Sequence, residues 1–269
     1  MFIANPTLSR DGSTVLFLGS TLGTVEDLYA MPTDGSSAPR RLTSTAPDPK
    51  NLPGPEVPLR VVRYESLDGT PVWATLYEPP PGTPKNGAAV VFLHGAGYLQ
   101  QVRASTGFPN YTVNHHFHRR LAAQGYVVFA PDFRGSAGYG RKFRADVYQK
   151  LGLPTRRTSW PASAGSWRPG IDPDRIGLYG GSYGGFLTLM CMLRFPREFA
   201  AGAALRPVTD WRTYQPEYTR PLFGGGPAEV PDAYRLCSPS TRPTSSSARS
   251  SCAMGSSTTT SSSRTRSAS

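Results

Sequence analysis

The sequence lacks several features that would assign it to other classes of protein. It has no apolar run near the roughly 18–20 residues that span a bilayer, and the stretch Val15–Leu18 is too short for a secretory signal. Its cysteines (Cys191, Cys237 and Cys252), three in 269 residues, do not describe a disulfide framework. Apolar residues are not scarce: 38% of the chain is hydrophobic, which is enough for a folded domain with a core.

Acidic and large aliphatic residues are missing from one long segment. Residues 238–269 contain no Asp, Glu, Val, Ile, Leu or Phe, and we expect this Ser/Thr/Arg tail to be disordered. Residues 155–169 show neither helical nor strand periodicity. The tail holds four arginines and residues 155–169 hold three, so seven positive charges of a net +11 lie in two atypical segments. The basic charge therefore does not predict a nucleic-acid partner. A tail that binds nucleic acid is the competing hypothesis.

The remaining sequence divides into three regions. Residues 1–46 contain two short apolar strands, Thr14–Gly19 and Asp27–Met31, separated by Asp-Gly turns. A Pro-rich linker follows at 47–58. Residues 59–237 begin with two alternating strands and then change to a repeated order of strand, loop and helix. The predicted strands are Arg60–Tyr64, Val72–Tyr77, Ala88–Leu93, Tyr126–Ala130, Ile176–Tyr179 and Phe199–Leu205, and the helices are Asn114–Ala123 and Phe186–Arg194. This alternation predicts an α/β domain with a mainly parallel sheet.

A G-x-S-x-G motif lies between the strand at 176–179 and the helix at 186–194. Small residues must flank the serine of such a tight strand-to-helix turn, because larger side chains would collide with neighbouring strands. The pattern predicts Ser182 as a nucleophile whose hydroxyl projects above the sheet. The N–H of Tyr183, at the helix start, would face a developing oxyanion.

A second loop, His94–Gly97, directly follows the strand at 88–93. We expect its backbone N–H groups at Gly95 and Ala96 to complete the oxyanion hole, and His94 itself to have a structural role. Three further histidines (His115, His116 and His118) resemble a metal cluster, but no carboxylate or thiolate lies nearby in the sequence. They are expected to pack or to be solvated, and no metal site is predicted.

The elements HGAGY, APDFRGSAGYGR, DPDRIGLYGGSYGG and RPVTDW together resemble the catalytic domain of the prolyl oligopeptidase family of serine peptidases, with the dipeptidyl-peptidase IV branch most similar. The resemblance covers most of residues 56–237. It implies an α/β-hydrolase fold, truncated at its carboxyl-terminal end and preceded by a short β-propeller remnant at 1–46.

The resemblance also implies a function. The expected activity is release of N-terminal dipeptides through an acyl-enzyme on Ser182, with a peptide as substrate. No metal, organic cofactor, membrane or nucleic acid is implied, and a homodimer is one possible assembly of the full-length parent. Matching the family motifs assigns Tyr214 and Tyr218 to a small pocket for the substrate side chain and makes Asp132 and Arg134 structural. A carboxylesterase on the same fold and a non-catalytic fragment are the alternatives.

The catalytic triad is incomplete in this sequence. In α/β-hydrolases the acid and the histidine follow the nucleophile along the chain. No histidine follows Ser182, and Asp210, in the VTDW element, is not at the acid position. The chain as written is therefore expected to be inactive. Reading the codons of residues 154–169 and of those from Ser240 onward one base earlier restores apolar, family-like patterns, the second containing HGLVDDNV. We interpret both segments as local frameshifts.

Overall fold

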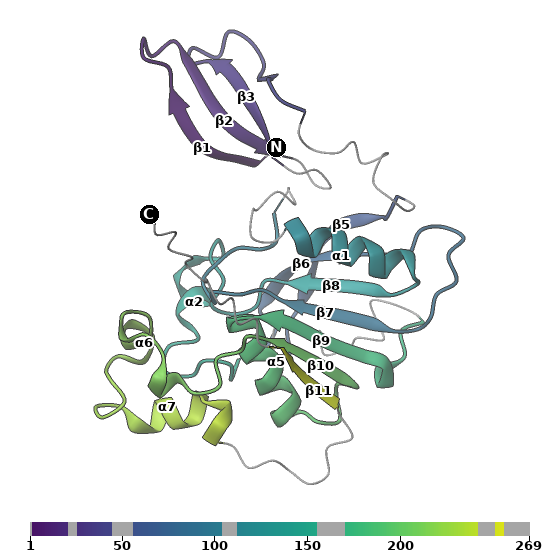
Figure 1. Cartoon of the computed structure of the whole chain (residues 1–269), viewed down its shortest axis with the longest axis vertical. Helices are drawn as coiled ribbons and strands as arrows, with labels where there is room; N and C mark the ends of the chain where they lie inside the picture. Colours follow the sequence, from purple (N-terminus) through teal and green to yellow (C-terminus); the bar gives the residue numbers. More distant parts are fainter. Residues whose placement is uncertain are drawn as a thin grey trace, which may run out of the picture.

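The computed structural model describes residues 2–20, 26–44, 56–103, 112–154, 170–241 and 251–255. The predicted frameshifted segment 155–169, most of the predicted linker and most of the predicted tail lie outside these residues. Two sheets are present, a small one near the amino terminus and a larger one flanked by helices (Figure 1). Among the described residues, no helix combines the length and the apolar character needed to cross a bilayer.

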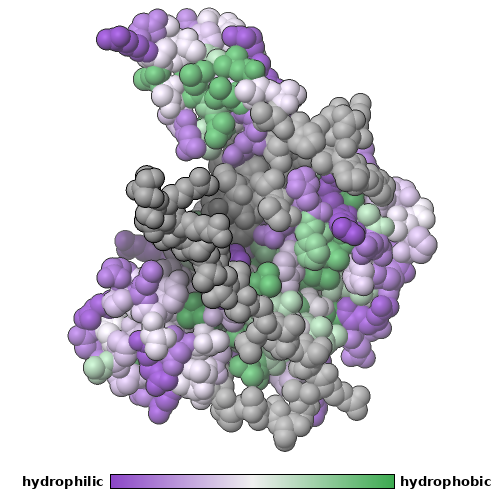
Figure 2. Space-filling model, in the orientation of Figure 1, coloured by the Kyte–Doolittle hydropathy of each residue, from purple (hydrophilic) through white to green (hydrophobic). Residues whose placement is uncertain are grey.

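The small sheet has four antiparallel strands, β1 (Phe2–Leu8), β2 (Thr14–Ser20), β3 (Asp27–Pro32) and β4 (Arg40–Arg41), in that order. Its first turn forms because Asp11 accepts hydrogen bonds from the hydroxyls of Ser9 and Ser13, at 2.6 and 2.9 Å. The rings of Phe17 on β2 and Tyr29 on β3 stack on each other, with centroids 5.7 Å apart. Figure 2 shows hydrophobic surface over this sheet. Both predicted strands are present, and β1 and β4 are additional.

The large sheet contains seven strands in the order β11-β10-β9-β7-β8-β6-β5. β5 and β6 form an antiparallel hairpin that also pairs antiparallel with β8, while all other neighbours are parallel. The strand bounds are β5 (Leu59–Glu65), β6 (Pro71–Tyr77), β7 (Ala89–Leu93), β8 (Val127–Pro131), β9 (Ile176–Gly181), β10 (Ala201–Leu205) and β11 (Ser251–Gly255). This confirms the predicted fold class, a mainly parallel sheet flanked by helices.

The central strands are apolar on both faces because helices cover both faces (Figure 1). Along β7, Val91 and Leu93 belong to the core shared with helix α5 (Tyr183–Arg194), whereas Phe92 belongs to a cluster on the opposite face. Helix α1 (Thr112–Ala123) lies on that opposite face, where Ala122 packs with Tyr77 and Val128. Successive side chains of β7 therefore point to opposite faces of the sheet, alternately toward α5 and toward α1.

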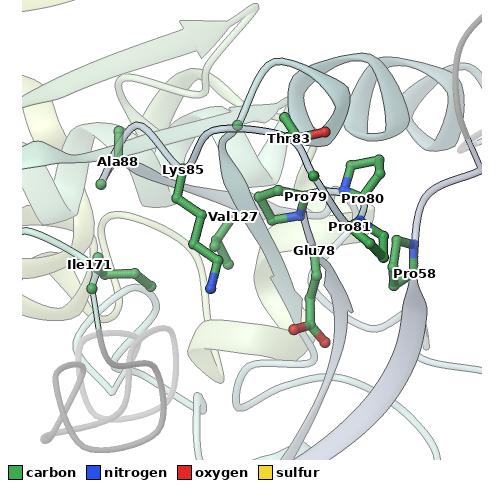
Figure 3. A pocket seen from close by; sticks show the side chains of 14 residues that line it. Pro58, Glu78, Pro79, Pro80, Pro81, Thr83, Lys85, Ala88, Val127 and Ile171 are labelled. Atoms are coloured by element: carbon green, nitrogen blue, oxygen red, sulfur yellow. The ribbon is translucent and has the colours of Figure 1, made fainter.

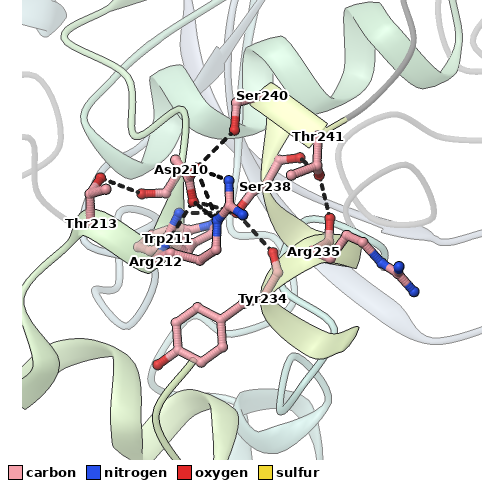
Figure 4. Close-up of polar contacts among 9 residues, drawn as sticks. All are labelled: Asp210, Trp211, Arg212, Thr213, Tyr234, Arg235, Ser238, Ser240 and Thr241. Atoms are coloured by element: carbon pink, nitrogen blue, oxygen red, sulfur yellow. Dashed lines mark hydrogen bonds and ion pairs between the residues drawn. The ribbon is translucent and has the colours of Figure 1, made fainter. Parts of the chain in front are cut away.

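Three short helices lie beside the carboxyl ends of the parallel strands: α2 (Gly140–Ala145), α6 (Pro216–Phe223) and α7 (Pro231–Cys237). In the part of the chain that the structure describes, the short 3-10 helices are η2 (Pro173–Arg175), η3 (Trp211–Thr213) and η4 (Pro239–Thr241). Asp210 caps η3 by accepting the N–H of Arg212, and η3 is tied to α7 through Ser238 (Figure 4). The Ser238 hydroxyl donates to the Tyr234 carbonyl at 2.8 Å and accepts the N–H of Trp211 at 3.0 Å.

The structure differs from the expectation of a disordered tail in two places. Ser238 is fully buried and η4 continues the α7 region, so the packed domain extends beyond residue 237 to Thr241. Strand β11 pairs in parallel with β10, with Gly202 opposite Cys252. The physical reason is that β10 without a neighbour would offer unpaired backbone N–H and C=O groups, which the backbone of residues 251–255 satisfies whatever its side chains.

Candidate active site

Ser182 lies at the junction of β9 and α5, as the motif predicted. Its backbone has φ 56° and ψ −116°, a left-handed conformation that few non-glycine residues adopt. The turn is held from both sides: the Ser182 N–H donates to the Leu205 carbonyl of β10, and its own carbonyl accepts the N–H of Phe186, each at 2.9 Å. The hydroxyl-bearing residue is thereby held at the carboxyl edge of the sheet, before the free N–H groups of the first helical turn.

Glycines make this turn possible because neighbouring backbone occupies the space of a side chain. A Cβ on Gly180 or on Gly184 would overlap the carbonyl oxygen of Leu93, the last residue of β7. A Cβ on Gly185 would lie 2.7 Å from the Leu205 carbonyl oxygen. The strand-to-helix turn is therefore packed directly against the ends of β7 and β10, which brings it beside the loop that follows β7.

That loop begins with His94, which is fully buried and stacks on Phe133 with ring centroids 4.1 Å apart. Its Nδ1 lies 2.9 Å from the Gly95 carbonyl oxygen and its Nε2 lies 2.9 Å from the Ser136 hydroxyl. A carbonyl can only accept, so Nδ1 carries the proton. Both ring nitrogens are thus engaged, one within the loop and the other with Ser136 after β8, which supports the structural role predicted for His94.

The backbone of the same loop turns back sharply at Ala96, which has φ 59°. The Ala96 carbonyl accepts the N–H of Tyr98 at 2.7 Å and the hydroxyl of Tyr218 at 3.3 Å. A Cβ on Gly97 would lie 3.0 Å from the ring of Tyr183. Gly95, Ala96 and Tyr183, the three predicted oxyanion-hole residues, therefore lie in segments that touch one another.

Asp132 and Arg134, both buried, hold the segments around this loop through polar contacts. The buried carboxylate of Asp132 accepts the N–H groups of Gln101 and Val102, at 2.8 and 3.1 Å, and the hydroxyl of Tyr139 at 2.7 Å. Arg134 is 10% exposed and forms ion pairs with Asp68 and Asp146, each at 2.5 Å. These contacts give both residues the structural role that the sequence predicted.

The predicted pocket residues Tyr214 and Tyr218 lie next to each other, with ring centroids 5.5 Å apart. The Tyr218 ring stacks on buried Trp211 at 5.8 Å, and Trp211 in turn lies 5.9 Å from Tyr183. Burial raises the pKa of the Tyr218 hydroxyl, and the neighbouring Tyr214 and Tyr98 add to this effect. The hydroxyl therefore remains protonated, as its hydrogen bond to the Ala96 carbonyl requires.

A cavity of about 220 Å³, which we call the tyrosine cavity, opens beside these rings. Tyr183 and Tyr218 line it together with Gly97, Val147 and Leu222. Tyr214 is not among its lining residues. The sequence motifs thus locate one wall of this cavity, whereas its other wall comes from the segment after α2, which sequence reasoning did not assign to the site.

The remaining histidines lie elsewhere. His115 and His118 are buried between α1 and the sheet, where His115 Nδ1 is 3.2 Å from the Tyr77 hydroxyl and His118 Nε2 contacts the Tyr179 hydroxyl. Burial lowers the pKa of His115 to about 4, with smaller contributions from His116 and Arg119. Burial also lowers the pKa of His118 to about 3, with a smaller contribution from the neighbouring His115. Among the described residues, no group of three His, Cys, Asp or Glu side chains could hold a metal ion.

A second cavity, of about 350 Å³, lies at the opposite edge of the sheet (Figure 3). Ala88 and Val127, at the amino ends of β7 and β8, line it with Pro79, Lys85 and Glu78. Glu78 is paired with Arg60 at 2.6 Å. In open α/β sheets ligands bind at the carboxyl ends of the strands, so the edge that carries Ser182 is the candidate active site.

The fold and the serine turn together define an α/β-hydrolase. A family model described as the prolyl oligopeptidase family matches residues 112–255, more than half of the chain. The chain belongs to the prolyl oligopeptidase family, which confirms the resemblance found in the sequence.

Individual relatives agree with this assignment. Dipeptidyl peptidase 8 of Homo sapiens is 33% identical over 174 residues, which are 62% of this chain and 18% of that protein. A protein named "Probable dipeptidyl-aminopeptidase B" of Fusarium vanettenii is 41% identical over 117 residues, 43% of this chain and 13% of that protein. The chain thus spans less than a fifth of the length of these relatives.

The fold is shared with solved structures. Dipeptidyl peptidase 4 of Porphyromonas gingivalis matches 94% of this chain and 35% of its own, with a TM-score of 0.74 and 24% identity. Puromycin hydrolase matches 89% of this chain and 36% of its own, with a TM-score of 0.72 and 22% identity.

Proposed function

We propose that Ser182 is the nucleophile of a serine peptidase that cleaves peptide bonds and releases N-terminal dipeptides. The observation that carries the proposal is the conformation of Ser182, at φ 56° on a glycine-packed turn against the His94–Gly97 loop. A left-handed serine costs on the order of 1 kcal/mol or more, and such strain clusters at functional sites. The relatives' names, dipeptidyl peptidase and dipeptidyl-aminopeptidase, supply the substrate class.

The proposed chemistry follows from the groups around the turn. The Ser182 oxygen bonds to the scissile carbonyl carbon, and the N–H groups of Tyr183 and of the Gly95–Ala96 segment hold the resulting oxyanion. The carbon–nitrogen bond then breaks and the amine leaves with a proton. Water hydrolyses the acyl-enzyme and restores the serine. The tyrosine cavity, lined by Tyr183 and Tyr218, would receive a substrate side chain.

The Ser182 hydroxyl needs a base that takes its proton as it attacks. The four histidines of the sequence all precede Ser182, and both ring nitrogens of His94 are engaged. We therefore expect the 269-residue chain by itself to be inactive, since loss of the triad base lowers the rate about 10⁴–10⁶-fold. The frameshift hypothesis places the missing acid in the shifted reading after Ser240.

The proposal is tested with a serine-directed fluorophosphonate and with chromogenic dipeptidyl amides. We expect the chain to be labelled slowly and at Ser182 alone, with Ser182→Ala as the control. A version with the shifted reading restored and its downstream sequence added should be labelled rapidly and should release dipeptides. Hydrolysis of simple esters without dipeptidyl amides would instead favour the carboxylesterase.

One outcome would contradict the proposed nucleophile, and another would contradict the expected inactivity. Labelling that is unchanged in Ser182→Ala would place the nucleophile elsewhere. Rapid turnover by the 269-residue chain would mean that it contains a base, and His94→Gln would then identify or exclude His94.

A further inference from the structure

A third cavity, of about 510 Å³, adjoins the tyrosine cavity and has a different electrostatic character. It lies between α2 and α6, and Arg144, Val147, Pro221 and Leu222 line both cavities. Because these four residues form a common wall, the two cavities lie side by side. Tyr183, the residue after the candidate nucleophile, lines the near one.

The far cavity is cationic. Arg141 and Arg144 of α2 both line it, and no acidic residue is among the residues around it. Asp146, the acidic residue closest in sequence, is occupied by Arg134 and by Lys150, at 2.5 and 2.9 Å. Of the described carboxylates, none lies within 4.0 Å of either arginine of α2. Two arginines with no partner among the described acids therefore line one cavity.

The near cavity is mixed in charge, because Glu217 of α6 lines it together with Arg144. A carboxylate in the near cavity would be repelled by Glu217, whereas one that reaches the far cavity meets only arginines. The apolar wall shared by the two cavities, Val147, Pro221 and Leu222, suits the methylene groups of a longer side chain.

We propose that the groove between α2 and α6 is a specificity subsite for a substrate residue with a carboxylate side chain, and that Arg144 is the residue that recognises it. The inference rests on the proposed peptidase function, since Tyr183, which lines the near cavity, directly follows Ser182 in the chain. We expect glutamate to bind better than aspartate, because its side chain is longer by one methylene and reaches further toward the far cavity. Arg144 can offer two parallel N–H donors to a carboxylate.

The test measures binding by the 269-residue chain, so it does not require turnover. Nuclear magnetic resonance titration gives dissociation constants for the tetrapeptides Ala-Glu-Ala-Ala, Ala-Asp-Ala-Ala and Ala-Gln-Ala-Ala. We expect the Glu peptide to bind about tenfold more tightly than the Gln peptide, with the Asp peptide between them. Arg144→Gln should reduce the ratio to about one, and Glu217→Gln should increase it by about threefold.

Lys142→Gln is the matched control. It removes one positive charge from the same helix, but Lys142 lines neither cavity. We expect it to retain the preference for the Glu peptide. Equal loss in Lys142→Gln and Arg144→Gln would indicate general charge attraction and would overturn the subsite.

The remaining outcomes separate the subsite from the peptidase proposal. Equal binding of the Glu and Gln peptides by the unaltered chain overturns the subsite and leaves peptide recognition intact. Binding of none of the peptides overturns the subsite and also counts against a peptide substrate, whereas fluorophosphonate labelling tests Ser182 independently.

Discussion

The two faces of the large sheet are covered in different ways. On the α5 face, one continuous core of 23 buried residues joins the sheet to the helix among the described residues, and backbone meets backbone at Gly180 and Gly184. On the α1 face, two clusters of four and three buried residues are supplemented by histidine–tyrosine contacts. A larger side chain on the α5 face can be accommodated only if a strand or the helix moves. The α1 face depends on side chains that can change conformation and on histidines that can take up a proton.

The largest effect is expected at the backbone contact of the α5 face. In Gly184→Ala the new Cβ overlaps the Leu93 carbonyl, so α5 must move away from β7. We expect a loss of at least about 4 kcal/mol in the free energy of unfolding, measured by urea denaturation. Gly177→Ala is the control, since its Cβ meets nothing closer than 3.8 Å. Similar free energies of unfolding in the two variants would mean that the close backbone contact does not make the α5 face rigid.

The second prediction compares a buried ion pair at the carboxyl edge of the sheet, formed by Arg134, with an exposed one. Its replacement in Arg134→Met leaves Asp68 and Asp146 without their shared cation, and we expect a loss of about 2–4 kcal/mol. Arg235→Met, which breaks an exposed pair with Asp232, should cost about 0–1 kcal/mol. Urea denaturation at two salt concentrations measures both. An equal loss in the two variants would show that burial of the pair has no energetic importance.

The α1 face should respond to pH instead. His115 and His118 have folded-state pKa values of about 4 and 3, below the ordinary 6.5, because burial disfavours the charged ring. The unfolded chain therefore binds more protons between pH 6.5 and about 3, and stability is full above 6.5 and falls as the pH is lowered through this window.

A substitution separates this effect from general acid denaturation. We expect His118→Phe to flatten the pH dependence of the unfolding free energy between pH 6.5 and 4 by roughly half, because one of the two buried groups no longer titrates. His116→Phe is the matched control. An unchanged slope in His118→Phe would mean that α1 tolerates protonated histidine.

The smallest expected effect concerns strain at the serine turn. Ser182→Gly should be more stable than Ser182→Ala by about 1 kcal/mol, because glycine adopts φ 56° without the penalty of a Cβ. Thermal unfolding of the two variants measures the difference, and neither should be labelled by a fluorophosphonate. Equal melting temperatures would indicate that the turn carries no strain.

The elements that were predictable are those with strong local signals. The apolar runs that became β7, β8 and β9 could be recognised because a strand buried on both faces has no polar side to alternate. Ser182 could be recognised because the glycines around it are required by the turn itself. Strand β1 and helices α6 and α7 were missed, since α6 contains Pro221 and α7 is only seven residues long.

The sequence alone determined the fold class, the family and the position of Ser182, because hydrophobic periodicity and turn chemistry are local properties. Only the tertiary structure decided how separate segments combine. It joined Arg144 of α2 to Leu222 of α6 across one groove, buried Ser238 against Trp211, and paired β11 with β10. Each of these arrangements brings together residues that are distant in the chain, so no local sequence pattern predicts it. The pairing of β11 with β10 is also made by backbone groups, which do not depend on side-chain type.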